Sequence, residues 1–128
     1  MGYLLDTHSF LWFVKGDGQL SERAGKMIAD PDTVKYVSIV SFLEIAIKIS
    51  IGKLKPNLTF QDLGQQIAIN GFYILPVTFE HSFELANLDF HHKDPFDRMI
   101  IAQTLTENLT LISKDRSFEK YKNLQLLW

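Results

Sequence analysis

The sequence alternates short apolar segments with longer segments of helical periodicity, and this alternation limits the fold more than any other feature. Five apolar runs are rich in β-branched and aromatic residues and are too short for helices. They are predicted to be strands at Tyr3–Asp6, Val34–Ser38, Tyr73–Val77, Leu109–Ser113 and Leu124–Leu127. Strands that alternate with helices form a parallel sheet covered by helices on both faces, so we predict an α/β fold.

The predicted helices begin and end at residues with known capping preferences. Gly71 follows the third helix in the usual stop position, and Asp94-Pro95 combines a good N-cap with a good first helical residue. The helices are predicted from Ser21 to about Asp30, from Ser38 or Ser41 to about Gly52, from Thr59 to Asn70, from Thr78 to Leu88 and from Asp94 to about Asn108.

Composition narrows the class of protein further. A chain of 128 residues is long enough for one well-packed domain, so we predict a single domain over residues 1–128. The absence of cysteine excludes disulfides and thiolate zinc sites, and the formal charge of −2 means that any nucleic acid would need local positive charge or a metal ion. We find no secretion signal and no apolar run of membrane-spanning length, and we expect a cytoplasmic protein with no membrane partner.

Two acids directly follow predicted strands. Asp6 ends the first strand, and Asp115 comes two residues after the fourth. The carboxyl edge of a parallel sheet is where such folds place metal and phosphate ligands. Each residue also has a simpler explanation, because Asp6 is a suitable cap for a helix from His8 onward and Asp115 for a short helix near Phe118.

Two further acids belong to predicted helices. Ser41, Glu44 and Lys48 form a single polar line on a helix that is otherwise apolar, which indicates a polar site. A capping box of Ser41 and Glu44 with an added Glu44–Lys48 pair explains the same pattern if the helix starts at Ser41. Asp97 falls in the first turn after Asp94, where the helix dipole already favours a carboxylate.

Taken together, the four acids indicate a metal site more strongly than any of them does alone. Carboxylates that share a site repel one another, and burial increases this cost. A divalent cation removes it, and oxygen ligands without cysteine favour Mg²⁺ or Mn²⁺ over zinc. A hard cation held in this way typically binds phosphate oxygens and activates water.

The segments around these acids resemble PIN-domain nucleases, and their order along the whole chain is similar to that in VapC-type toxins of toxin–antitoxin systems. The matching segments are Leu4-Leu5-Asp6-Thr7-His8-x-Phe10-Leu11-Trp12, Val37-Ser38-x-x-Ser41-x-x-Glu44-Ile45-x-x-Lys48, Gly52-Lys53-Leu54, Asp94-Pro95-Phe96-Asp97-Arg98-x-x-Ile101-Ala102-Gln103 and Ser113-Lys114-Asp115-x-x-Phe118. Many relatives have Ser or Asn where this chain has His8.

The resemblance implies a three-layer α/β/α sandwich with a mostly parallel five-stranded sheet. It also implies a Mg²⁺- or Mn²⁺-dependent endoribonuclease that uses metal-activated water and leaves 5′-phosphate and 3′-hydroxyl ends. The expected partners are an RNA substrate, a VapB-like antitoxin and a second copy of the chain in a homodimer.

The same resemblance assigns roles to individual residues. Asp6 and Asp97 are the expected main metal ligands, Glu44 binds directly or through water, and Asp115 completes the site or holds a second ion. The hydroxyls of Thr7, Ser41 and Ser113 are expected to hydrogen-bond these carboxylates. The cationic residues that flank the acids and are available for the RNA backbone are Lys48, Arg98, Lys114 and Arg116.

Other readings of the sequence stay open. His8, His91 and His92 allow a metal-free acid–base mechanism, although His91 and His92 also suit a polar loop. An inactive binding module with the same fold is a second alternative. A phosphoacceptor domain is a third, but it requires an adjacent pair of acids after the first strand. Finally, a helix cannot bury the consecutive Leu11, Trp12 and Phe13 equally well in its own core, so either the remainder forms an interface or a tightly packed core absorbs all three.

Overall fold

A parallel sheet forms the centre of the protein in the computed structural model, which describes residues 2–54 and 59–128. Its five strands are β1 (Gly2–Leu5), β2 (Val34–Ser38), β3 (Tyr73–Leu75), β4 (Thr110–Ile112) and β5 (Gln125–Leu127). They lie in the order β3-β2-β1-β4-β5, and every neighbouring pair is parallel. The chain moves outward from β1 to β3 and then returns to the other side of β1, so the order reverses between β1 and β4.

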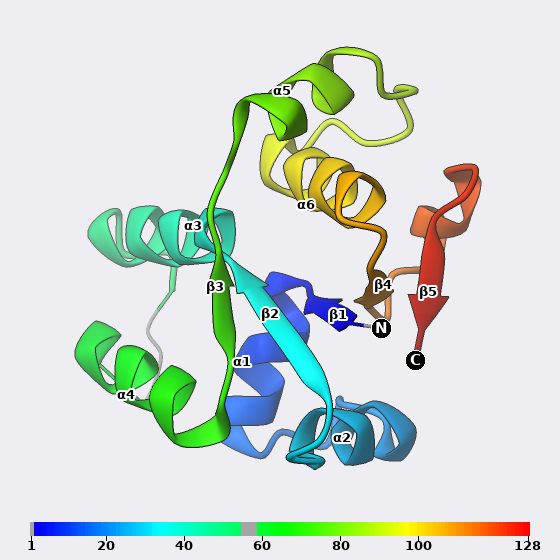
Figure 1. Ribbon diagram of the computed structural model, residues 1–128. Helices are drawn as coiled ribbons and strands as arrows, with labels where there is room; N and C mark the ends of the chain where they lie inside the picture. Colours follow the sequence, from blue (N-terminus) through cyan, green and yellow to red (C-terminus); the bar gives the residue numbers. More distant parts are fainter. Residues whose placement is uncertain (1, 55–58) are drawn as a thin grey trace.

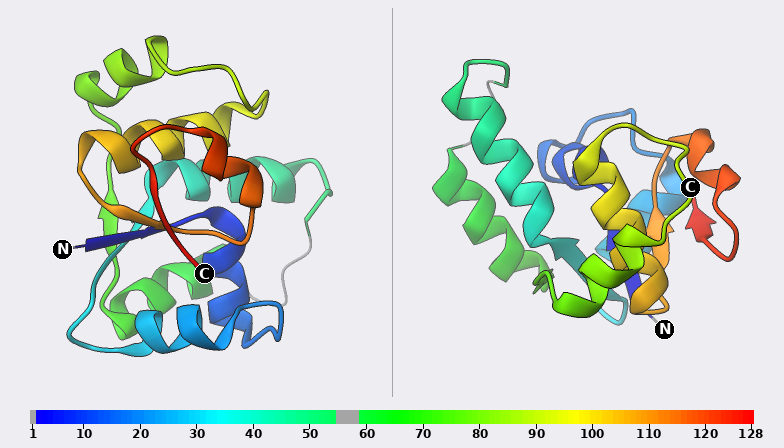
Figure 2. Two further views of the ribbon diagram at one scale, coloured as in Figure 1. Left: turned by 90° about the vertical axis from the view of Figure 1, so that its right-hand side faces the viewer. Right: turned by 90° about the horizontal axis from the view of Figure 1, so that it is seen from above.

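Helices cover both faces of this sheet, which confirms the predicted α/β/α sandwich. Figure 1 shows α5 and α6 on one side and α1, α2 and α4 on the other, and Figure 2 shows the same layers from two further directions. The helices are α1 (Thr7–Lys15), α2 (Glu22–Ala29), α3 (Ile39–Ser50), α4 (Phe60–Asn70), α5 (Phe79–Ala86) and α6 (Pro95–Thr106), with a 3₁₀ helix η1 at Arg116–Lys120.

The two faces of the sheet have separate hydrophobic cores because successive side chains of a strand point to opposite faces. Leu5 and Ile112 face the core under α1, α2, α3 and α4. Leu4 and Leu111 face the core under α6 and η1. All four side chains have no exposed surface. Parallel strands buried on both faces read as continuous apolar runs, which is the pattern seen in the sequence.

Local signals explain where the helices begin. Ser21, Thr59, Thr78 and Asp94 are N-caps whose side chains accept backbone N–H groups, as their residue types predict. Gly71 ends α4 with φ of 71°, a left-handed conformation that costs glycine little. These caps agree with the predicted helix starts.

The strand boundaries differ slightly from the prediction. The first strand ends at Leu5, because Asp6 already serves as the N-cap of α1. The third strand ends at Leu75 and not at Val77, since Pro76 has no N–H to donate to a ladder. Of the helices in the described part of the chain, none is both long and apolar enough to cross a bilayer.

Candidate metal centre

The strand order places two predicted site segments side by side. Leu5 pairs with Ile112, so Asp6 and Ser113 both follow the carboxyl ends of neighbouring central strands. The Asp6 N–H donates to the Ile112 carbonyl over 3.1 Å and holds the two ends together. In open α/β sheets, ligand sites form at the position where the strand order reverses. The reversal between β1 and β4 therefore coincides with the predicted acids.

Asp6 is both a helix cap and a buried carboxylate of this edge. Its Oδ1 accepts the Ser9 N–H over 2.8 Å, and only 7 % of the residue is exposed. Burial raises the pKa of Asp6, while hydrogen bonds from Ser113 and Ser9 partly oppose the change. The capping explanation is therefore correct for Asp6, and the same residue lies at the predicted site.

Glu44 lies well inside α3, because the N-cap of that helix is Ser38. The predicted alternative of a capping box made by Ser41 and Glu44 is therefore wrong. Glu44 is 5 % exposed and both of its oxygens are bonded. Thr7 Oγ1 donates to Oε1 over 2.8 Å, and Lys48 Nζ donates to Oε2 over 2.7 Å. Ser41 Oγ lies 2.9 Å from Thr7 Oγ1, so Thr7 contacts this carboxylate directly and Ser41 contacts Thr7.

Asp97 occupies the third position of α6, where the dipole argument placed it. Burial is the main reason that the pKa of Asp97 rises to about 7, followed by repulsion from Asp94, Glu44, Asp6 and Asp115. The structure therefore brings Asp97 within electrostatic range of the other three predicted acids. Asp94 itself has a capping role and accepts the Asp97 N–H over 3.2 Å.

Asp115 differs from the other acids, because hydrogen bonds outweigh burial there. Burial alone raises its pKa, but bonds from the Ser117 hydroxyl and backbone, together with His92, lower it overall. His92 Nε2 lies 3.7 Å from Asp115 Oδ2, and one ligand atom each of His92, Asp97 and Asp115 lie within 4.8 Å of one another. The tightest grouping of ligand atoms in the described residues thus includes a histidine and does not include Asp6 or Glu44.

His92 was missing from the predicted site. Its side chain is 10 % exposed, stacks on Tyr121 and has a partner at each ring nitrogen. The distances are 2.9 Å from Nδ1 to the Tyr121 hydroxyl and 2.8 Å from Nε2 to Ser117 Oγ. A polar loop was the expected place for His92, and its position just ahead of Asp97 was the signal available in the sequence.

The hydrogen bonds around His92 fix its role as a donor. The Ser117 hydroxyl has one hydrogen, and it donates this to Asp115 Oδ1 over 2.6 Å. Ser117 Oγ must then accept from His92 Nε2–H, which leaves Nδ1 of a neutral ring to accept from Tyr121. Because Nε2 carries a hydrogen, the groups offered to a cation are the carboxylates.

The cationic residues at the edge have different surroundings. Lys48 is paired with Glu44, whose hydrogen bond raises the pKa of the lysine. Arg98 donates to the carbonyls of Asp89 and Leu88 over 3.1 and 3.5 Å, so its guanidinium lies at the loop before α6. Lys114 is exposed, and its Nζ lies 5.8 Å from the centre of the Trp12 ring.

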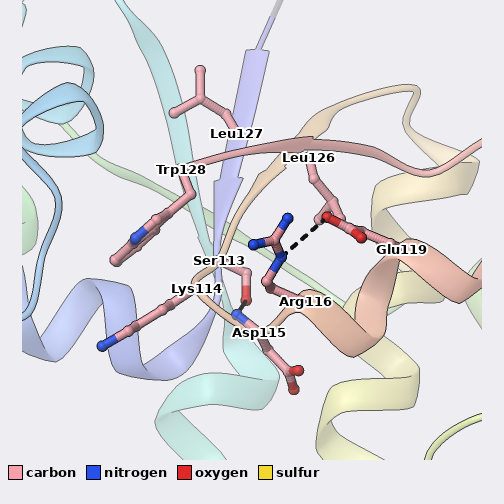
Figure 3. A pocket seen from close by; sticks show the side chains of 8 residues that line it. All are labelled: Ser113, Lys114, Asp115, Arg116, Glu119, Leu126, Leu127 and Trp128. Carbon is pink, nitrogen blue, oxygen red and sulfur yellow. Dashed lines mark hydrogen bonds and ion pairs between the residues drawn. The ribbon is translucent and has the colours of Figure 1, made fainter.

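Two adjoining pockets open beside the acids. The smaller, of about 220 Å³, is lined by Asp6, His8, Trp12, Lys114 and Asp115. The larger, of about 480 Å³, is lined by Ser113, Lys114, Asp115, Arg116, Glu119, Leu126, Leu127 and Trp128 (Figure 3). They share Lys114 and Asp115, so the two pockets adjoin at these residues.

The protein therefore belongs to the α/β class, and its acidic site lies where the order of the parallel strands reverses, at their carboxyl ends. The model of the PIN domain family matches residues 3–124, and the chain belongs to this family. Among curated protein sequences, none gives a significant match.

Solved structures show the same fold over nearly the whole chain. A structure of VapBC2 from Rickettsia felis bound to a promoter DNA fragment is similar with a TM-score of 0.73 and 18 % identity, covering 99 % of this chain and 98 % of that one. VapBC-1 from nontypeable Haemophilus influenzae has a TM-score of 0.68 and 18 % identity, with 99 % and 97 % covered. FitAcB from Neisseria gonorrhoeae has a TM-score of 0.69 and 16 % identity, with 98 % and 96 % covered.

Proposed function

We propose that this chain is a Mg²⁺- or Mn²⁺-dependent endoribonuclease that acts as one nuclease domain. The observation that carries the proposal is the gathering of carboxylates at the carboxyl edge of the sheet, where Asp6 follows β1 and Asp115 follows β4, and where one ligand atom each of His92, Asp97 and Asp115 lie within 4.8 Å of one another. Burial and repulsion from Asp94, Glu44, Asp6 and Asp115 raise the pKa of Asp97 to about 7, which agrees with this placement. Such a cluster is costly without positive charge, so the arrangement suits a divalent cation better than it suits a purely structural role.

The donor set fits a hard cation. Carboxylate oxygens are the ligands that Mg²⁺ and Mn²⁺ prefer, and the chain has no cysteine that would favour a softer metal. Asp6 and Asp97 would hold the ion, and Glu44 and Asp115 would complete the site directly or through water. Thr7 and Ser117 hold the last two carboxylates in place through hydrogen bonds.

A divalent cation at this site would polarise a phosphate oxygen and lower the pKa of a bound water molecule. Glu44 or Asp115 would orient the attacking water as a hydrogen-bond acceptor, since each carboxylate oxygen can accept more than one hydrogen bond. Lys48 and Lys114 would contact the phosphates beside the scissile bond. Hydrolysis in this manner gives 5′-phosphate and 3′-hydroxyl ends.

Cleavage of a labelled single-stranded RNA by the purified chain tests this mechanism. We expect activity with Mg²⁺ or Mn²⁺, none with EDTA, and a loss of about a thousandfold or more in Asp6→Asn. The matched control is Asp32→Asn, since Asp32 is exposed and lies in the turn before β2, at the amino end of that strand. Cleavage that persists in EDTA and in Asp6→Asn, with cyclic phosphate ends, would support the histidine mechanism instead. A metal titration without uptake would favour the inactive module.

We further propose that the chain is the toxin of a toxin–antitoxin pair and works in the cytoplasm as a homodimer with a VapB-like antitoxin. The support is the fold shared with the VapBC and FitAcB structures. Induced expression of the chain alone should arrest growth, and Asp6→Asn should abolish the arrest. Light scattering of the purified chain measures whether it dimerises. Growth that continues despite active, metal-dependent RNA cleavage would argue against the toxin role.

A further inference from the structure

Of the consecutive residues Leu11, Trp12 and Phe13, Trp12 is the one that does not pack in a hydrophobic core. Leu11 is buried in the core, and Phe13 packs against it with its ring edge-to-face on Phe72. Within the described residues, Trp12 belongs to neither core cluster. Its ring instead lies 5.7 Å from the His8 ring and 6.0 Å from the Trp128 ring, with Lys114 over it.

These rings stand directly beside the carboxylates. The smaller pocket has Asp6 and Asp115 in its lining together with His8, Trp12 and Lys114. Trp128 belongs to the larger pocket, and its edge-to-face contact with Trp12 connects the two aromatic walls. In Figure 3, Lys114 and Trp128 point to the same side of the segment after β4, whereas Asp115 points away from them.

Positive charge gathers at the same place in a chain whose formal charge is −2. Among the described residues, Lys114 is in no ion pair, and its ammonium is held only over the Trp12 ring. Arg116 pairs with Glu119 at 3.7 Å, but its side chain is 88 % exposed. Exposed pairs of this kind contribute little energy, so the guanidinium remains available to another anion.

Aromatic rings next to free cations form the usual surface for unpaired nucleobases. Bases stack on Trp or His rings while Lys and Arg contact the neighbouring phosphates, and this works only for bases that are not already stacked in a duplex. Because the two pockets share Lys114 and Asp115, a base stacked on these rings would lie beside a phosphate bound at the carboxylates.

We propose that His8, Trp12 and Trp128 form a stacking subsite for an unpaired RNA base next to the scissile phosphate, with Lys114 and Arg116 on the adjoining phosphates. This subsite rests on the proposed ribonuclease function and extends it to the substrate, which would be a single-stranded segment. His8 then has a role as one side of the subsite, since its ring lies 5.7 Å from that of Trp12.

Tryptophan fluorescence gives a direct readout, because Trp12 and Trp128 are the only two tryptophans of the chain. Asp97→Asn would be titrated with a single-stranded RNA, with its duplex, and with the same strand carrying one abasic nucleotide. We expect strong quenching by the single strand and much weaker quenching by the other two. Equal quenching by all three would overturn the subsite, since it would show binding without an unpaired base.

Steady-state cleavage separates the subsite from the catalytic site. Trp12→Leu should raise KM by about tenfold or more with kcat little changed, and Trp12→Phe should recover most of the loss. The control is Phe79→Leu, which removes an exposed ring on α5. If the wild type cleaves RNA and Trp12→Leu has the same KM, the subsite is wrong and the nuclease proposal stands. If the wild type never cleaves RNA, the nuclease proposal fails, and the fluorescence titration still decides whether bases stack here. Thermal melting confirms that each variant is folded.

Discussion

Thr7 Oγ1 lies 2.8 Å from Glu44 Oε1, and this hydrogen bond joins the first turn of α1 to the middle of α3. Both residues are buried, and Glu44 receives its second bond from Lys48. The carboxylate is therefore held by one neutral and one charged donor before any metal binds. A carboxylate whose orientation is fixed in advance loses little entropy when it binds an ion or a water molecule.

The first prediction concerns this contact. Thr7→Val keeps the shape of the side chain but removes the donor, so one buried oxygen of Glu44 loses its partner at a cost of about 1–3 kcal/mol. We expect Mn²⁺ affinity to fall by about tenfold or more, measured by calorimetry, with a comparable loss in RNA cleavage. Thr7→Ser restores the hydroxyl and should recover most of both. Equal losses in Thr7→Ser and Thr7→Val would mean that packing of the methyl group matters and the hydroxyl does not.

A second prediction follows from the pKa of Asp97, which is about 7 against an ordinary value of 3.8. Between these two values the folded protein keeps a proton that the unfolded chain has lost. The free energy of unfolding of the metal-free protein therefore falls as pH rises through this window. Above about pH 7 the destabilisation from Asp97 is fully present. The raised pKa of Asp6 acts in the same direction.

Asp97→Asn tests the sign of this effect. Near neutral pH and in EDTA, we expect the variant to be more stable than the wild type, because asparagine has no charge for burial and the nearby acids to oppose. The gain should be limited to about 1–2 kcal/mol, because water at the partly exposed carboxylate screens the repulsion. Below pH 4 the difference should disappear. Urea denaturation across this pH range measures both. Added Mn²⁺ should stabilise the wild type and leave Asp97→Asn nearly unchanged. A variant that is less stable than the wild type at neutral pH would contradict the assigned repulsion.

A third prediction concerns Gln103, which connects two helices that present acids to the site. Gln103 of α6 is fully buried, accepts the hydroxyl of Ser38 at the start of α3 and donates to the Pro76 carbonyl over 3.2 Å. Gln103→Ala removes the acceptor of the Ser38 hydroxyl and the donor to the Pro76 carbonyl, and it should cost about 2–4 kcal/mol of folding stability. Gln65→Ala on the exposed face of α4 is the control. A loss no larger than that of the control would show that water replaces the missing bonds.

Sequence reasoning succeeded where the relevant physics is local. The caps at Ser21, Thr59 and Asp94 act within one helical turn, so residue type and spacing are enough to predict them. The choice between Ser38 and Ser41 as the start of α3 was left open, because it depends on Gln103 and on how the strand before the helix ends. Both serines suit a cap by residue type, and in the structure Ser38 accepts the Val40 N–H and also bonds Gln103 of α6.

The candidate site also combines features that the sequence predicts with features that depend on the tertiary structure. The position of Asp6 and Asp115 at one edge was predictable, because parallel strands bring their carboxyl ends to the same edge. The role of His92 was not, since its partners Ser117 and Tyr121 lie 25 and 29 positions away along the chain. The same is true of Trp12, which could not be separated from Leu11 and Phe13 without knowing which side of α1 faces the core.

The fourth prediction concerns the hydrogen-bond chain from Tyr121 through His92 and Ser117 to Asp115. His92→Phe keeps a ring between Tyr121 and Phe118 but removes both nitrogens, so Ser117 loses the donor that orients it. Because His92 and Ser117 together lower the pKa of Asp115, we expect that pKa to rise in the variant. Carbon NMR of the Asp115 carboxyl in metal-free protein follows this directly.

Mn²⁺ affinity gives an independent measure of the same chain. A misoriented Asp115 should weaken binding by about tenfold in His92→Phe, within the range found when outer hydrogen bonds of a metal site are lost. Tyr121→Phe is the matched variant, since it removes the far end of the chain and keeps the bond between His92 and Ser117; its effect on both measurements should be smaller. If the Asp115 titration and the Mn²⁺ affinity stay unchanged in His92→Phe, the histidine only fills space between the aromatic rings, and Ser117 orients the carboxylate without it.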